Sequence, residues 1–470
     1  MGRGLAPGPA PAYHSGVAAH LTHPAHPFPF PPAGRARRRI PGALRGCAAL
    51  LALCAIAAAG VPGVGRAAGA EPAPAADAAG TDAPAASAAP GALPAVAIFD
   101  SAVAALRAEF FDPARLGAHF DSSVVYRRAS LAAAGPGANV QGQLQGLLRE
   151  LGYSGCRFYR EGQAPDYTPA FRWRETLDGV VVTAVQPGSS CEHAGLARGD
   201  YLMTPRSDLP GVRGTSVTLR VRTSDGVEWS QPVLREGLAA NDPDLGWNSY
   251  SEHLGYLRVN RLHDPAVVDT AVRHVRRFAN LILDVRGCAD ADPSVLHLLS
   301  YFATVPSTAG YVANHAGVAA LGRPQVKSVP QDAAENSGDP GLLNPALGQH
   351  GLVVLRVQPA DSAFQGRVVV LADEGTAGYA ELVPAWFRAE KRGSVVGRIT
   401  AGRGGLPATL RAAPGWTLEV PTAGLFLPDG VLLEGNGVEP THFVKWRQVD
   451  IRAGADPDVE RAQQLLYVEP

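Results

Sequence analysis

Residues 366–405 constrain the fold of this chain more than any other stretch, with the sequence GRVVVLADEGTAGYAELVPAWFRAEKRGSVVGRITAGRGG. The β-branched run at 368–371 predicts a short buried strand, and a tight turn at 373–376 leads into an apolar-rich helix over 381–387. A second strand at 394–397 and a glycine-rich loop follow. A strand that feeds a helix through a tight turn gathers backbone N–H groups, and hydrolases present nucleophiles at such turns. An ordinary βαβ unit has the same local pattern, so the rest of the chain must decide between them.

The whole chain excludes several classes of protein. Its 470 residues leave room for two or three domains, and a hydrophobic content of 46% supports real cores. A formal charge of −1 gives no electrostatic case for a nucleic-acid partner. We expect no metal and no cofactor. Beyond residue 70 an odd number of cysteines remains, namely Cys156, Cys191 and Cys288, which we expect to be buried thiols and not a disulfide framework.

The first 94 residues are not predicted to form a domain. Residues 1–33 are rich in Pro, Ala and His and predict a disordered extension. In residues 34–70, arginines precede an apolar run at 47–61 and a small-residue site at 68–70, which is the order of a secretory signal. Residues 71–94 form an Ala/Pro linker. We therefore expect an exported protein in the periplasm or cell envelope, either free or tethered to the inner membrane by an uncleaved anchor.

Three folded parts follow the linker. Residues 95–169 predict a helical cap, in which apolar residues recur at helical spacing and Gly152 ends the second helix. Residues 170–238 predict a small β domain, and residues 250–470 an α/β core that ends in an amphipathic helix. Within this core, residues 310–360 are rich in Gly, Pro and Asn and predict an insertion or long loop. The fold class is thus α+β or α/β.

The stretch from 366 to 405 resembles the S41 peptidase family, the tail-specific or C-terminal-processing proteases. In that family the turn after the strand is similar to Thr-Ala-Ser-Ala-Ser-Glu, and its first serine is the nucleophile. A later loop, similar to Thr-Phe-Gly-Lys-Gly, supplies a lysine as general base. Here the turn 376–381 reads TAGYAE and the loop 400–404 reads TAGRG. The resemblance therefore places Gly378 at the nucleophile position and Arg403 at the base position, 25 residues apart as in the family.

Further motifs extend the resemblance over about 95–470. Residues 281–286 (LILDVR) are similar to the family's Leu-Ile-Leu-Asp-Leu-Arg strand, after which active members use a Gly-rich segment to form the oxyanion hole. Here Gly287 is followed by CADAD, so that segment has lost glycines and gained two carboxylates. We expect Asp284 and Arg286 to form a structural ion pair. Residues 434–440 (EGNGVEP) resemble the family's C-terminal signature, and Gly155 stands where the tricorn-like branch has a catalytic histidine.

The small β domain resembles a PDZ module. Residues 194–200 (AGLARGD) match the signature Ala-Gly-Leu-x-x-Gly-Asp that ends the module's short helix. Such modules bind a peptide as an added strand and hold its C-terminal carboxylate with backbone N–H groups. A small β domain that packs on its neighbour and binds nothing is the alternative. The resemblance implies that peptide-binding residues lie at Val180, Val181, Val182, Gly195 and Leu196.

Two functions are consistent with these residues. The first is an exported protein that keeps the scaffold of the family, binds polypeptides or their C-termini and has lost Ser–Lys chemistry. The second is an active serine-type endopeptidase of the S41 family that cleaves unstructured polypeptides with a displaced nucleophile. Thr376 or Tyr379 would then attack, with Lys391 or His442 as the base.

Overall fold

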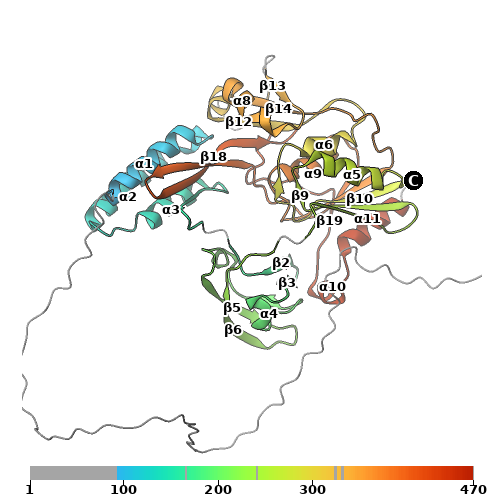
Figure 1. Cartoon of the computed structure of the whole chain (residues 1–470), viewed down its shortest axis with the longest axis horizontal. Coiled ribbons are helices and arrows are strands. Elements are labelled where there is room, and N and C mark those ends of the chain that lie inside the picture. Colours follow the sequence, from blue (N-terminus) through green and yellow to red (C-terminus); the bar gives the residue numbers. More distant parts are fainter. Residues whose placement is uncertain (1–92, 165–166, 240–241, 322–324, 330–332, 469–470) are drawn as a thin grey trace, which may run out of the picture. The chain divides into compact units, whose positions relative to one another are not determined.

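The computed structural model describes residues 93–468 except for 165–166, 240–241, 322–324 and 330–332 (Figure 1). The predicted extension at 1–33, the signal or anchor at 34–70 and residues 71–92 of the predicted linker lie outside the described residues. The described part from Leu93 onward forms one unit that contains several sheets. None of its described helices is long and apolar enough to span a membrane.

The centre of the core is a six-stranded sheet in the order β19-β16-β15-β10-β8-β7. Its strands are β7 (Leu245–Ser249), β8 (Leu254–Val259), β10 (Asn280–Asp284), β15 (Arg367–Ala372), β16 (Ser394–Gly397) and β19 (His442–Phe443). All neighbours from β8 to β19 are parallel, and β7 is an antiparallel edge strand. The strands β8, β10 and β15 are almost continuously buried, as expected of parallel strands covered on both faces.

Helices from widely separated parts of the sequence cover this sheet. They are α5 (Pro265–Val275), α6 (Val295–Ser300), α9 (Leu382–Ala389) and α11 (Pro457–Val468). The first three share one apolar cluster with the sheet, and α11 contacts β10, β15 and β16. Helix α5 ends at Val275, and Arg276 is its C-cap residue. A short parallel pair, β9 (Arg261–Leu262) and β11 (Asp290–Ala291), and the helix α10 (Gln448–Ala453) complete this part.

A second sheet joins the helical cap to the core. It runs β1-β18-β12-β14-β13, with β17 paired to β18. Its strands are β1 (Arg157–Arg160), β12 (Ser307–Asn314), β13 (Ala334–Asn336), β14 (Leu352–Val357), β17 (Gly405–Ala413) and β18 (Trp416–Phe426). The cap helices α1 (Ala95–Glu109), α2 (Ala118–Ala134) and α3 (Val140–Leu151) share an apolar cluster with β1 and β18. A 3-10 turn, η1 (Pro113–Arg115), separates α1 from α2.

The prediction of a long loop at 310–360 is wrong. This stretch contains most of β12, β13 and β14 and the helices α7 (His315–Leu321) and α8 (Pro340–His350). The residues that suggested a loop serve as helix ends: Asp339 caps α8, Pro340 is its first residue, and Gly351 ends it in a left-handed conformation. Helix α2 was not predicted either, because only Phe120 and Leu131 of its residues are buried and its apolar face is weak.

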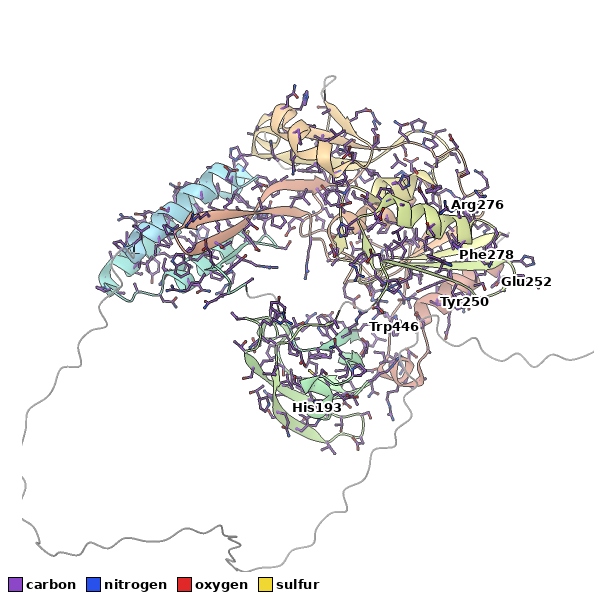
Figure 2. The ribbon with its side chains drawn as sticks, in the orientation of Figure 1. His193, Tyr250, Glu252, Arg276, Phe278 and Trp446 are labelled. Atoms are coloured by element: carbon purple, nitrogen blue, oxygen red, sulfur yellow. The ribbon has the colours of Figure 1, made fainter. Side chains whose placement is uncertain are left out.

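The small β domain is a separate five-stranded sheet in the order β2-β3-β4-β5-β6. Its elements are β2 (Phe171–Thr176), β3 (Gly179–Val185), α4 (Ser190–His193), β4 (Tyr201–Leu202), η2 (Arg206–Asp208), β5 (Ser216–Arg222) and β6 (Glu228–Leu234). Phe171, Val182 and Leu219 belong to its own buried cluster. Trp446, labelled in Figure 2, belongs to a different cluster, where it packs with Val181 and Ile451.

Candidate functional site

The sharp turn after β15 has the geometry of a nucleophile elbow. The short turn η3 (Gly378–Glu381) follows the strand and leads directly into α9. Gly378 has a φ of +63°, in the left-handed region that strongly favours glycine. A Cβ atom at this position would meet nothing closer than the carbonyl oxygen of Arg403, at 3.9 Å. The elbow therefore has room for a side chain but carries none.

A buried carboxylate, Glu381, joins the elbow to the loop that contains Arg403. Its Oε1 accepts hydrogen bonds from the N–H groups of Gly378 (3.0 Å) and Arg403 (2.9 Å). Its Oε2 accepts from the N–H of Gly402 (2.8 Å) and from the hydroxyl of Thr400. Burial raises the pKa of Glu381, and these hydrogen bonds oppose the rise. Sequence reasoning gave Glu381 no role, although a carboxylate at the start of an apolar helix was a usable signal.

The base position holds a free positive charge. Arg403 is exposed, and within the described part of the chain its guanidinium makes no ion pair or hydrogen bond. Only its main chain is fixed, by the hydrogen bond to Glu381. The structure thus brings the main chains of Gly378 and Arg403 close together, and Arg403 adds a permanent cation to this loop.

The oxyanion region is occupied by a carboxylate of the chain itself. The N–H of Gly287 donates to Oδ1 of Asp373 at 2.7 Å, and the N–H of Gly375 donates to the same oxygen at 3.0 Å. Asp373 in turn pairs with Arg174 at 2.9 Å. A backbone donor that would stabilise a developing oxyanion is therefore already used.

A buried ion-pair cluster includes Asp373, at the start of this turn. It comprises Arg174, Arg258, Arg286, Arg398, Asp284, Asp373, Asp456 and Asp458. Asp284 pairs with Arg258 and Arg286, both at 2.7 Å, so the predicted structural pair is present in a larger network. Burial alone would raise the pKa of Asp284, but the two guanidinium groups outweigh burial and hold that pKa well below its usual range. The same balance lowers the pKa of Asp458.

The two carboxylates beyond Gly287 share one histidine. Nε2 of His263 lies 2.6 Å from Asp290, and its Nδ1 lies 3.2 Å from Asp292. Partial burial lowers the pKa of His263, but these carboxylates prevail and raise it. In the described ranges no group of three or more His, Cys, Asp or Glu side chains is arranged to hold a metal ion. All three cysteines of the described part are buried and free, as predicted.

One family model matches part of the chain and agrees with the resemblance seen in the sequence. Residues 253–444 match the model of peptidase family S41. These residues form an S41 protease-like core within a mixed α/β fold. The match spans β8 to β19 and so includes the elbow, the Arg403 loop and the Gly287 region.

Solved structures show the same fold over a wider range. The photosystem II D1 C-terminal processing protease is 16% identical, covers 80% of this chain and 98% of its own length, and gives a TM-score of 0.51. Mature CPAF complexed with lactacystin is also 16% identical, covers 79% of this chain and 97% of its own, with a TM-score of 0.55. At such identities the likeness concerns the fold alone. No curated protein sequence matches the chain.

The residues proposed above as a displaced nucleophile and its base are poorly placed to attack a peptide bond. Thr376 is fully buried, and its hydroxyl donates to the carbonyl of Val285 at 2.9 Å. Tyr379 is 7% exposed, and burial raises the pKa of its hydroxyl well above the ordinary value. Lys391 follows the far end of α9, roughly 12 Å from the elbow at 1.5 Å per helical residue. His442 lies in β19, next to Val396 of β16.

Gly155, which the resemblance aligns with the catalytic histidine of the tricorn-like branch, brings no catalytic side chain to this core. Gly155 has a φ of +78°, and a Cβ atom there would lie 3.6 Å from Pro407. Its neighbour Ser154 donates through its N–H and its hydroxyl to Glu434, which also accepts from the N–H of Gly405. This carboxylate of the C-terminal signature is thus bound by a serine and backbone groups.

The predicted peptide-binding residues do not form an open edge. Val180, Val181 and Val182 belong to β3, which pairs with β2 on one side and with β4 on the other. Val181 and Val182 are fully buried, and Leu196 lies in the core of the small domain. Gly195, beside Leu196, has a φ of +87°. A peptide cannot add beside β3, because its backbone groups are already paired; the edges of this sheet are β2 and β6.

Proposed function

We propose that this chain is an exported polypeptide-binding protein with an S41 scaffold and no Ser–Lys peptidase activity. The observation that carries the proposal is the elbow, where Gly378 presents no hydroxyl and Arg403 lies beside it. A Ser–Lys pair needs an attacking oxygen and an amine that is neutral near pH 7. Glycine has no such oxygen, and a guanidinium does not lose its proton in that range.

Two further features argue against hydrolysis at this elbow. The N–H groups of Gly287 and Gly378 already donate to Asp373 and Glu381, so neither is free to stabilise an oxyanion. Thr376, the nearest hydroxyl in the turn, is buried and engaged. An active endopeptidase with a displaced nucleophile would need this turn to rearrange, and we therefore favour a binding function.

The small β domain supplies one place for an extended peptide. Its strand β2 ends the sheet, and an added strand would pair there through main-chain hydrogen bonds. Arg174 of β2 is not available for a peptide carboxylate, because it pairs with Asp373 and Asp458. The exposed Arg403 supplies a second place, since a guanidinium binds a carboxylate in a bidentate manner. We propose that the ligand is a polypeptide recognised through its free C-terminus.

Binding is tested with paired peptides that end either in a carboxylate or in an amide. We expect the carboxylate form to bind the chain tenfold or more tightly, about 1.4 kcal/mol, as measured by fluorescence anisotropy. Arg403→Gln should reduce this difference if the elbow holds the carboxylate and leave it intact if β2 does. Arg411→Gln removes an equal charge from the exposed side of β17 and is the matched control. Equal affinities for both peptides, or no binding of either, would remove the proposal.

Export is proposed from the order of basic, apolar and small residues between 34 and 70. A tagged full-length chain should then be found in the periplasmic or membrane fraction of its cells. Release from the membrane after processing near residue 70 would indicate a cleaved signal, and retention would indicate an anchor at 47–61. Recovery in the cytosol with Met1 intact would contradict export.

A further inference from the structure

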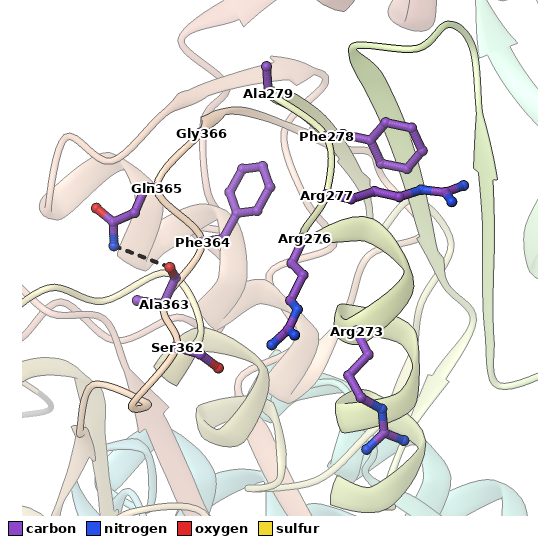
Figure 3. Close-up of a pocket in the computed structure, with 10 residues that line it drawn as sticks. All are labelled: Arg273, Arg276, Arg277, Phe278, Ala279, Ser362, Ala363, Phe364, Gln365 and Gly366. Carbon is purple, nitrogen blue, oxygen red and sulfur yellow. Dashed lines mark hydrogen bonds between the residues drawn. The ribbon is translucent and has the colours of Figure 1, made fainter.

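A depression rich in arginine lies at the amino ends of the central strands, whereas the elbow lies at their carboxyl ends. It has a volume of about 450 Å³ and lies between the end of α5 and the loop that precedes β15. Its lining residues are Arg273, Arg276, Arg277, Phe278, Ala279, Ser362, Ala363, Phe364, Gln365 and Gly366 (Figure 3). They surround the amino ends of the parallel strands β10 and β15, whereas the elbow follows the carboxyl end of β15. The depression therefore does not belong to the site described above.

The lining of this depression carries positive charge and no carboxylate. Arg276 makes no side-chain ion pair or hydrogen bond in the described part of the chain, and Arg273 bonds only the hydroxyl of Thr270, at 2.9 Å. The nearest carboxylate on the same helix, Asp269, is held by His297 (2.5 Å) and Tyr301 (2.8 Å). This contrasts with the buried arginines of the ion-pair cluster, which all face carboxylates.

The carboxyl end of α5 does not require three cations to neutralise its partial charge. The carbonyl end of a helix carries a partial charge of about −0.5. Arg273, Arg276 and Arg277 together bring three positive charges to the end of α5. Even if one guanidinium serves the helix, the depression keeps a net positive charge, which favours an anionic ligand.

The side chains also have a suitable arrangement. Arg276 extends from the end of α5 toward the loop, and the hydroxyl of Ser362 points into the gap between them, whereas Arg273, one helical turn away, extends along the helix (Figure 3). Arg277 points away from the loop and lies over the ring of Phe278, with its Cζ 4.9 Å from the ring centroid. Figure 2 shows Arg276 and Phe278 at this outer end of α5. Two guanidinium groups and a hydroxyl that line one depression can together bind the oxygens of a tetrahedral anion.

We propose that Arg273, Arg276 and Ser362 form a binding site for a phosphate group. A dianionic phosphate is favoured over a single carboxylate because at least two guanidinium charges line the depression. A free phosphorylated solute and the headgroup of an anionic phospholipid share this chemistry. Ser362 also lines a neighbouring polar depression with His297, Ser300, Ser337 and the carboxylate Asp361, which leaves space for a polar, uncharged or cationic group attached to the phosphate.

The test measures binding of inorganic phosphate, pyrophosphate and lipid vesicles to the full chain. Titration calorimetry follows the two free anions, and cosedimentation follows vesicles with or without phosphatidylglycerol in a phosphatidylcholine background. A free-solute site predicts binding of pyrophosphate and indifference to phosphatidylglycerol. A headgroup site predicts sedimentation that depends on phosphatidylglycerol and is suppressed by added pyrophosphate.

The double variant Arg273→Gln/Arg276→Gln should weaken whichever interaction is found by tenfold or more. The variant Arg149→Gln/Arg220→Gln removes the same charge from exposed positions outside the depression and should bind as the wild type does. All four positions are exposed, and unchanged circular dichroism verifies folding of both variants. The proposal is overturned if the wild-type chain binds none of the three probes, or if the two double variants lose affinity equally.

Discussion

The ion-pair cluster and the elbow lie next to each other in the core, but they differ in whether their charged side chains have partners. In the cluster, four arginines face Asp284, Asp373, Asp456 and Asp458, and nearly every buried polar atom has a partner. At the elbow, Gly378 presents only backbone, and Arg403 has no partner in the described part of the chain. Asp373 belongs to both regions, since it accepts from Gly287 and pairs with Arg174. The comparison teaches that a nearly fully paired network of buried charges can lie next to a turn whose side chains offer neither a nucleophile nor a base.

The largest expected effect concerns catalysis at the elbow. Removing the nucleophile of a catalytic unit costs on the order of 10⁶ in rate, so the wild-type chain should not cleave an unstructured fluorogenic polypeptide above background. Gly378→Ser alone should stay inactive, because Arg403 cannot accept the proton of the new hydroxyl. Gly378→Ser combined with Arg403→Lys should give weak cleavage at most. Robust wild-type cleavage that Thr376→Ala abolishes would support the displaced nucleophile instead.

The second effect is the stability of the ion-pair cluster. Asp458 is fully buried and pairs with Arg174, Arg286 and Arg398, so Asp458→Asn leaves buried positive charge without its counter-ion. We expect a loss of about 3–5 kcal/mol in the free energy of unfolding, measured with urea. Glu335→Gln, which removes one partner of the exposed pair with Arg356, should cost at most about 1 kcal/mol. Similar costs for both variants would contradict the contrast.

The cluster should also make the protein sensitive to acid. The folded-state pKa values of Asp284 and Asp458 lie below those of the unfolded chain. Their contribution to stability is therefore complete above the unfolded pKa, near 4, and is lost as pH falls through the folded values. We expect urea midpoints to decline below about pH 5. The decline should be shallower in Asp458→Asn, and an unchanged slope would show that this carboxylate does not drive it.

The smallest effect tests whether the elbow has room for a side chain. Gly378→Ala places a methyl group where nothing lies closer than 3.9 Å, so its cost should come from the left-handed backbone alone, about 1 kcal/mol. Gly152 is a left-handed helix cap with a φ of +72° and nothing within 4 Å of its added Cβ, and Gly152→Ala is the matched control. Urea unfolding should give nearly equal losses. A much larger loss at Gly378 would mean that the elbow cannot accept a serine either.

Much of the core could be predicted because its elements are local and strongly patterned. The run at 368–371 lies in β15, the helix after the turn is α9, and the apolar run at 281–284 lies in β10. The stretch at 310–360 escaped prediction, because its short strands pair with β18 and with each other and its polar residues end helices. That Val180, Val181 and Val182 lie on an interior strand could not be predicted, because the pattern of a single strand does not give the order of strands in a sheet.

The sequence by itself determined the register of the S41 core. Glycine at 378 and arginine at 403 cannot attack or deprotonate, whatever surrounds them, because these limits belong to the side chains themselves. The tertiary structure decided which partners the buried carboxylates have. Asp373 accepts a hydrogen bond from Gly287 and pairs with Arg174, and Glu381 accepts from the loop that contains Arg403. Glu434 accepts a hydrogen bond from Ser154. Several of these partners are separated by more than 80 residues, and a buried carboxylate takes the donors that folding brings within reach.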